Sequence, residues 1–135
     1  MIFLSVDDFS KVIKDDILDR IINSDQTLLD DAELAVVKEM QSYINHRYDG
    51  ATIFAQTGSD RNPLIVMYAV DMLLYHIHSR LNPRQISDVR RDRYDAALQF
   101  LRAIASGELS PDLPKSATDT GIIAYHGPQR RPNRY

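Results

Sequence analysis

Residues 63–80 read PLIVMYAVDMLLYHIHSR and form the most apolar stretch of the sequence. One carboxylate, Asp71, lies in its middle. A helix that is apolar on nearly every side is expected inside a helical bundle or between subunits. An acid in such a helix must be paired, neutralised or functional. We therefore expect this helix to be the central element of the fold.

Three further helices are expected before the central one. Ser5 is placed to cap a first short helix, and a second short helix is predicted over residues 17–22. A longer helix is predicted from Asp30 or Asp31 to about Tyr48, and residues 51–62 are predicted to be a connection. The residues expected on the apolar face of the longer helix are Leu34, Val37, Met40 or Gln41, and Ile44. The residues of the connection expected to contact the core are Ile53 and Phe54.

A turn at Asn82-Pro83 is expected to separate the central helix from a long helix over residues 84–106, which Gly107 ends. The predicted inner face of that helix consists of Ile86, Val89, Arg93, Ala97, Phe100 and Ile104. The expected fold class is therefore all-α. It is a small bundle of four to five helices, with two long antiparallel helices and an extended C-terminal tail. A helical domain is expected over residues 1–107, and a docking tail over residues 108–135.

Asp71 and Arg93 are predicted to form a structural ion pair. Asp71 is eleven residues before Asn82 and Arg93 is eleven residues after it, so antiparallel helices place the two at about the same level. The functional alternative is that Asp71 acts as a general base.

Two other groups of residues are candidates for contacts with other chains. On the central helix, Tyr75, His76 and Ile77 are the candidate subunit interface. The tail is rich in proline and ends in the basic sequence HGPQRRPNRY, and residues 120–125 are its only candidate strand. The tail residues predicted to bind a partner are Ile122, Ile123, Tyr125, Arg130, Arg131, Arg134 and Tyr135.

Charge is distributed unevenly along the chain. Residues 1–60 hold 5 basic and 12 acidic side chains, whereas residues 61–135 hold 11 basic and 7 acidic side chains. Such polarity suits head-to-tail association or a charged partner, and chance segregation on a solvated surface is the alternative.

Several functional classes have little support in the sequence. The absence of cysteine excludes disulfides and thiolate metal sites. His76 and His78 are two residues apart, which places them on different sides of a helix and does not suit a shared metal. No catalytic, metal-binding or cofactor-binding residue is assigned, so the protein is not expected to be an enzyme. It is expected to be soluble and to have no membrane contact.

The Pro-led helix PLIVMYAVDMLLYHIH, followed by the helix RRDRYDAALQFLRAIASG, resembles a known family. The likeness is to small tailed-phage neck proteins, which are called head–tail connector, head completion or adaptor proteins, and above all to the Mu-like neck-protein family. It covers about residues 3–110. The residues that carry it are Asp71, Tyr75, Arg93, Tyr94, Ala97, Leu98, Leu101, Ile104, Ala105 and Gly107.

The resemblance implies a structural role in the virion neck, after assembly in the host cytoplasm. Subunits of this family are expected to form a homo-oligomeric, dodecameric ring below the portal protein. The ring extends the channel through which DNA passes without sequence-specific contact, and it offers a docking surface to tail or stopper proteins.

Two alternatives come from other functional classes. The first is a helical nucleic-acid-binding or regulatory module that uses the Arg-rich helix at residues 84–102. Its arginines alternate with Asp88, Asp92 and Asp95, which favours a self-paired, solvated face. The second alternative is an enzyme with a histidine and aspartate site in a cleft.

Overall fold

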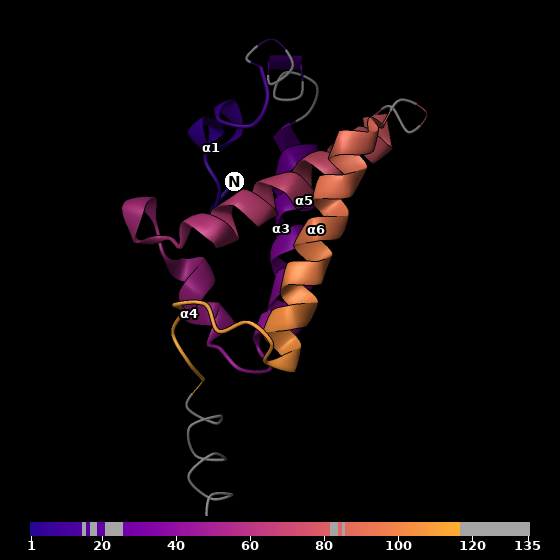
Figure 1. The fold of residues 1–135 in the computed structure, drawn as a ribbon. Coiled ribbons are helices and arrows are strands. Elements are labelled where there is room, and N and C mark those ends of the chain that lie inside the picture. The colour runs from indigo at the N-terminus through magenta and orange to yellow at the C-terminus, as the bar shows by residue number, and fades with distance from the viewer. Residues whose placement is uncertain (15, 17–18, 21–25, 82–83, 85, 117–135) are drawn as a thin grey trace, which may run out of the picture.

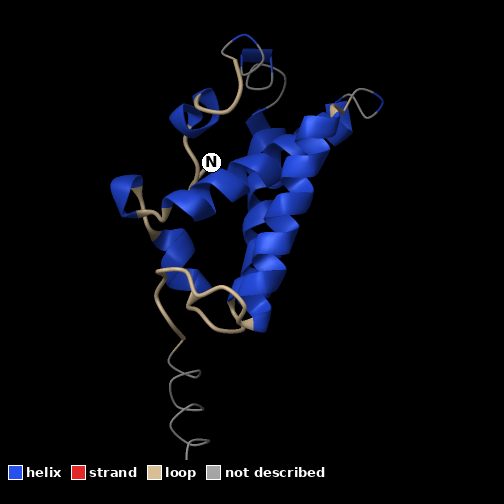
Figure 2. Cartoon of the chain, in the orientation of Figure 1, coloured by secondary structure: helices blue, strands red, loops and turns tan. Residues whose placement is uncertain are grey.

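The computed structural model describes residues 1–14, 16, 19–20, 26–81, 84 and 86–116. These residues form helices joined by loops, and they contain no strand beyond an isolated bridge between Tyr48 and Lys115 (Figure 2). The predicted all-α class is therefore confirmed. The predicted second short helix, the Asn82-Pro83 turn and residues 117–135 of the tail lie wholly or largely outside the described residues.

Three helices of 19 residues each make up most of the described fold. Figure 1 shows α5 rising across the molecule, while α3 and α6 descend side by side and α5 packs against both. The two long helices of the prediction are α5 and α6, which run in opposite directions but cross obliquely in Figure 1, and α3 is as long as either of them. The elements are α1 (Val6–Ser10), α3 (Gln26–Ile44), α4 (Gly50–Ala55), the 3₁₀ helix η1 (Gly58–Asp60), α5 (Pro63–Leu81) and α6 (Asp88–Ser106).

Local sequence signals fix the ends of α5 and α6. The Asn62 side-chain oxygen accepts the backbone N–H groups of Leu64 (2.9 Å) and Ile65 (3.3 Å), and Pro63 occupies a position where no N–H is needed. The Ser87 hydroxyl accepts the N–H of Arg90 at 3.1 Å. Gly107 ends α6 in the left-handed region, with φ of 87°.

The hydrophobic core is centred on α5, as the apolar composition of that helix predicts. Ile65, Ala69, Met72, Leu73 and Leu74 are fully buried, and residues of α3, α4 and α6 pack around them. Ile53 and Phe54 are also buried in the core, as predicted. They belong to α4, however, a short helix capped by Asp49 in a segment that was predicted to be a connection.

The predicted apolar face of α3 is partly wrong. Leu34 is 59% exposed, whereas the buried residues of the helix are Leu29, Glu33, Val36, Met40 and Ile44. The helix also begins at Gln26 and ends at Ile44, about four residues earlier than predicted at each end. Its inner face contains Glu33 because the carboxylate of this residue accepts the backbone N–H groups of Ile2 (2.6 Å) and Leu4 (2.8 Å). Periodicity of apolar residues cannot predict a buried acid with backbone partners.

The predicted inner face of α6 contains a similar error. Val89 is 66% exposed, and the next residue, Arg90, points inward toward Asp71 instead. Ala97, Phe100 and Ile104 are buried as predicted.

The chain beyond α6 first returns to the helical core. Leu113 is buried, the carbonyl oxygen of Pro114 accepts the N–H of Asp49 at 2.8 Å, and the N–H of Ser116 is donated to the carbonyl of Arg47 at 3.2 Å. Residues 114–116 therefore lie against the loop between α3 and α4.

Candidate functional site

The structure brings Asp71 and Arg93 together across α5 and α6. The Nε of Arg93 donates to the Oδ1 of Asp71 at 2.7 Å, and Asp71 is 2% exposed. The Arg93 side chain is 40% exposed, so this guanidinium connects the buried acid with the surface. The arrangement matches the predicted structural ion pair, and the acid is occupied by this charge-assisted hydrogen bond.

Arg90 is a second basic partner of Asp71 that the sequence reasoning missed. Its Nη1 lies 3.7 Å from the Oδ1 of Asp71 and is buried without a hydrogen-bond partner among the described residues. Burial lowers the pKa of the Arg90 guanidinium, while the Asp71 carboxylate opposes that shift and the Arg93 charge adds to it. Two arginines one turn apart on α6 therefore share one buried acid. In the sequence, the i, i+3 spacing of Arg90 and Arg93 indicates that both side chains lie on the same side of the helix.

The three residues of the candidate subunit interface differ in how deeply they are buried. Ile77 is buried in the core, so it cannot face another subunit, and that part of the prediction is wrong. Its burial follows from its position on the side of α5 that packs on the core. Tyr75 and His76 are only partly buried.

An aromatic patch forms where α5 meets α6, and it consists of Tyr75, His76 and Tyr94. The Tyr75 and Tyr94 rings stack with centroids 4.2 Å apart, and the His76 ring meets Tyr94 edge-on at 5.6 Å. The Nε2 of His76 lies 3.5 Å from a carboxylate oxygen of Glu39 on α3. Burial, and then the Glu39 charge, raise the pKa of Tyr94. Partly exposed tyrosines with an apolar body and a polar tip are common at protein interfaces.

Arg61 forms hydrogen bonds that hold the N-terminal segment against the helical bundle. The sequence analysis did not identify this residue. Its Nη1 donates to a carboxylate oxygen of Asp8 at 2.7 Å and to the carbonyl of Phe3 at 2.8 Å, and its Nε donates to the carbonyl of Gly58 at 2.9 Å. Burial alone would raise the pKa of Asp8, but Arg61 and the Ser5 N–H together hold that pKa below its usual value. Asp8 at the third position of α1 was the only local signal, and nothing in it indicates Arg61 as the partner.

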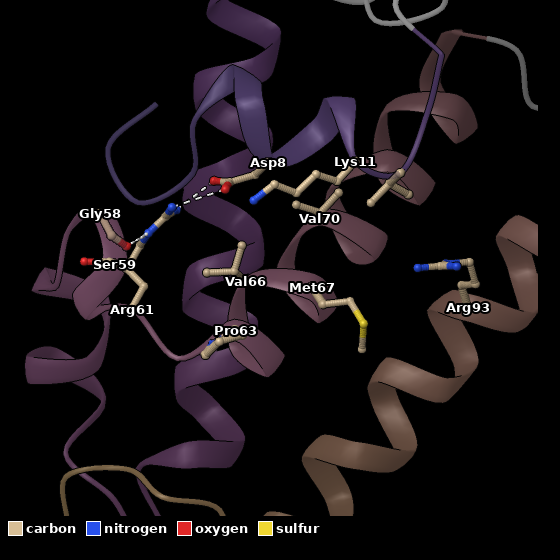
Figure 3. A pocket seen from close by; sticks show the side chains of 11 residues that line it. Asp8, Lys11, Gly58, Ser59, Arg61, Pro63, Val66, Met67, Val70 and Arg93 are labelled. Carbon is tan, nitrogen blue, oxygen red and sulfur yellow. Dashed lines mark hydrogen bonds and ion pairs between the residues drawn. The ribbon is translucent and has the colours of Figure 1, made fainter.

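A basic cleft of about 520 Å³ lies between α1, α5 and α6 (Figure 3). Val66, Met67 and Val70 form the apolar part of its lining, and Figure 3 shows Lys11 beside Val70, with Arg61 on the left and Arg93 on the right. Its lining includes three basic residues but only one acid, Asp8, which Arg61 neutralises. These side chains suit the binding of an acidic, apolar segment better than acid–base chemistry.

The Nδ1 of His78 lies 2.7 Å from the carbonyl oxygen of Leu74, so His76 and His78 have different partners. No group of three or more potential metal ligands occurs in the described ranges. Within those ranges, no helix is both long enough and apolar enough to cross a membrane. Every tail residue predicted to bind a partner, from Ile122 to Tyr135, lies outside the described part of the chain.

The arginines of α6 do not form one continuous basic face. Arg90 and Arg93 are turned toward Asp71, and Arg91 lies 3.6 Å from Asp88 in an exposed i, i+3 pair. Arg102 is exposed. This division weakens the nucleic-acid-binding alternative, because a phosphate-binding face needs several free cations on one side.

Comparison with known families decides between these possibilities at a coarse level. The family model described as Bacteriophage Mu, Gp36 matches residues 3–122. The chain belongs to this family. No curated protein and no solved structure matches the chain. The resemblance to Mu-like phage proteins, based on residues 3–110, is therefore confirmed.

The match to the Gp36 family includes most of the sites described above. The Asp71 pair, the Arg61 contacts and the aromatic patch all lie within residues 3–122. Ile2 and the three tail arginines lie outside the matched range.

Proposed function

We propose that this protein of the Gp36 family is a structural, non-catalytic component of the phage neck. In this proposal, copies of the chain form a homo-oligomeric ring below the portal protein. The ring extends the DNA channel and provides the surface to which tail or stopper proteins dock. The observation that carries the proposal is the family match over residues 3–122, which makes the chain a phage protein.

The contacts of the described residues support this role over catalysis. Asp71, Asp8 and Glu33 are the buried acids, and each is occupied by arginine or by backbone N–H groups. A buried acid that is held by a cation or by backbone N–H groups stabilises a fold but is poorly placed to accept a substrate proton. The aromatic patch supplies partly exposed side chains of the types that carry much of the binding energy at interfaces. We assign this patch to the boundary between neighbouring subunits.

A matched pair of tyrosine substitutions tests the interface. Tyr75 stacks on Tyr94 within the patch, and Tyr68 stacks on Phe100 at 4.4 Å between the same two helices, outside the patch. Both substitutions to alanine remove one α5–α6 ring contact, so their effects on folding should be similar. We expect Tyr75→Ala to abolish rings on the portal, and Tyr68→Ala to retain them.

The measurement is negative-stain electron microscopy and native mass spectrometry of each variant mixed with the portal protein of the same phage. Circular dichroism melting curves check that both variants fold. If wild-type protein shows no binding to the portal, the neck role is wrong. If Tyr75→Ala folds and assembles as well as Tyr68→Ala, the interface assignment is wrong.

A further inference from the structure

An apolar groove with an acidic rim lies on the side of α3 that faces the N-terminal segment. It has a volume of about 400 Å³, and its apolar lining includes Ile2, Phe3, Leu34 and Val37. Ile2 is 90% exposed, and Leu34 is also largely exposed. Asp30 and Asp31 lie at the rim, and the N-terminal ammonium of Met1, which also lines the groove, pairs with Asp30 at 2.7 Å. We call this site the acidic groove. Exposed apolar side chains that gather in one groove indicate a binding surface more strongly than scattered ones do.

The acidic groove is already formed in the isolated chain. The Glu33 carboxylate holds the backbone of residues 2–4 through their N–H groups. The Phe3 ring packs edge-on against Phe54 at 4.9 Å, and Arg61 donates to the carbonyl of Phe3. Because these contacts fix the wall of the groove, an incoming segment would lose little free energy to ordering its binding site.

We propose that the acidic groove receives the C-terminal tail, residues 117–135, of a second copy of this chain. The tail combines an apolar sequence, Ile122-Ile123-Ala124-Tyr125, with three arginines, and its one acidic side chain is Asp119. Apolar residues fit the floor, and the arginines complement Asp31 at the rim, whereas Asp30 already has the Met1 ammonium as its counter-charge. The basic cleft is less suitable for the same tail, because its one lining acid, Asp8, is already paired with Arg61 and its lining also contains Lys11.

The position where the tail begins favours a second copy over the same chain. Residues 115 and 116 lie beside Tyr48 and Arg47, just beyond the C-terminal end of α3. Leu34 is ten residues before the end of that helix, or roughly 15 Å along its axis at ~1.5 Å per residue. A tail that bound its own groove would have to turn back along α3, whereas a head-to-tail neighbour requires no reversal.

The tail and the groove are different surfaces, so the contact is heterologous and joins subunits in one direction. Such contacts produce closed rings or filaments. The inference thus rests on the proposed ring and names one contact that links its subunits. Ile2 and the tail arginines lie outside the matched residues 3–122, whereas Asp31, Leu34 and Val37 of the groove lie within them.

Site-specific cross-linking of the full-length protein tests the inference, because the chain contains no cysteine. One variant carries Leu34→Cys in the acidic groove, and a second carries Tyr125→Cys in the tail. The control is Met67→Cys, an exposed apolar side chain in the basic cleft. The variants are mixed in pairs and treated with a short bis-maleimide, and the products are identified by mass spectrometry.

We expect the cross-linking yield of Leu34→Cys with Tyr125→Cys to be at least about fivefold higher than that of Met67→Cys with Tyr125→Cys. Charge and apolar contacts both favour the acidic groove. Asp31→Arg in the groove should remove this excess, and Arg130→Glu, Arg131→Glu and Arg134→Glu together in the tail should restore it. Equal yields at Leu34 and Met67 would overturn the proposal. So would a chain carrying both Leu34→Cys and Tyr125→Cys that gives only an intramolecular product.

This experiment is independent of portal binding, so the two proposals can fail separately. Rings on the portal without the Leu34–Tyr125 cross-link would overturn only the tail contact. The cross-link in a protein that does not bind the portal would overturn only the neck role.

Discussion

At the scale of single residues, the two arginines that hold Asp71 differ in exposure, and this difference predicts unequal effects of substitution. Arg90 is 14% exposed and its Nη1 has no hydrogen-bond partner among the described residues, while Arg93 reaches the surface. If Arg93 is removed, Asp71 keeps Arg90 as a counter-charge. If Asp71 is removed, the buried Arg90 guanidinium loses its acidic partner.

We therefore expect Asp71→Ala to lower the free energy of unfolding by ~3–5 kcal/mol, the range for breaking a buried ion pair. Arg93→Ala should lower it by only ~1–2 kcal/mol, since its side chain is partly solvated and Arg90 remains. Asp88→Ala, which removes the exposed contact with Arg91, is the control and should change it by less than ~1 kcal/mol. Urea unfolding followed by circular dichroism measures all three. Equal losses for Asp71→Ala and Arg93→Ala would mean that Arg90 does not stabilise Asp71.

The lowered pKa of Asp8 predicts how the stability of the protein depends on pH. This pKa is lowered from 3.8 because Arg61 and Ser5 outweigh the effect of burial. A group with a lowered folded-state pKa stabilises the protein above its ordinary pKa, and that stabilisation is lost as the pH falls through the folded value. We expect the stability advantage of wild type over Asp8→Asn to be constant near neutral pH and to shrink below about pH 3.8.

Thermal unfolding of both proteins across the acid range measures this difference. The wild-type advantage should approach its minimum in strong acid, where the carboxyl group of Asp8 is protonated. A difference that stays constant, or that grows on acidification, would contradict the role given to the Asp8–Arg61 pair.

At the scale of elements, the end of α6 depends on Gly107. A Cβ atom at this position would lie 2.8 Å from the Cζ of Arg47, and the φ of 87° strains any other residue. Gly58 has a φ of 56° with open space around its Cβ position, so it is a matched control. We expect Gly58→Ala to cost ~1 kcal/mol of stability, and Gly107→Ala to cost more, ~1–2 kcal/mol.

The excess at Gly107 should come partly from its larger φ and partly from contact with the Arg47 guanidinium. It should therefore shrink when Gly107→Ala is made in an Arg47→Ala background, because the small side chain leaves room for the methyl group. Chemical denaturation of the two single variants and the double variant checks this. An equal cost at Gly58 and Gly107 would show that Arg47 does not pack closely on the end of α6.

The same scale shows what the sequence could and could not predict. Apolar periodicity and the signals at Pro63 and Gly107 were sufficient for α5, for the end of α6 and for the Asp71–Arg93 pair, because these depend on local patterns. The start of α6 was predicted four residues too early, at residue 84 instead of Asp88. Glu33 and Arg61 were not predictable in this way. Both bind backbone groups about 30 or more residues away, and such partners leave no periodic signal. The exposure of Leu34, and with it the acidic groove, follows from the burial of Glu33.

At the scale of the whole molecule, the charge of the chain is divided between an acidic part and a basic end. The acidic groove lies in residues 1–54, the more acidic part of the chain, and the tail arginines lie at the basic end. Polarised charge of this kind favours head-to-tail contacts between identical subunits. The same attraction should weaken as salt screens the exposed charges, with a screening length of ~8–10 Å near physiological ionic strength.

The most direct test of the central claim is a cryo-electron microscopy reconstruction of the neck of the phage that encodes this chain. We expect a ring of this protein directly below the portal, with Tyr75 and His76 at the boundary between neighbouring subunits. A neck reconstruction in which other proteins account for all density below the portal, together with the absence of this chain from purified virions, would contradict the account.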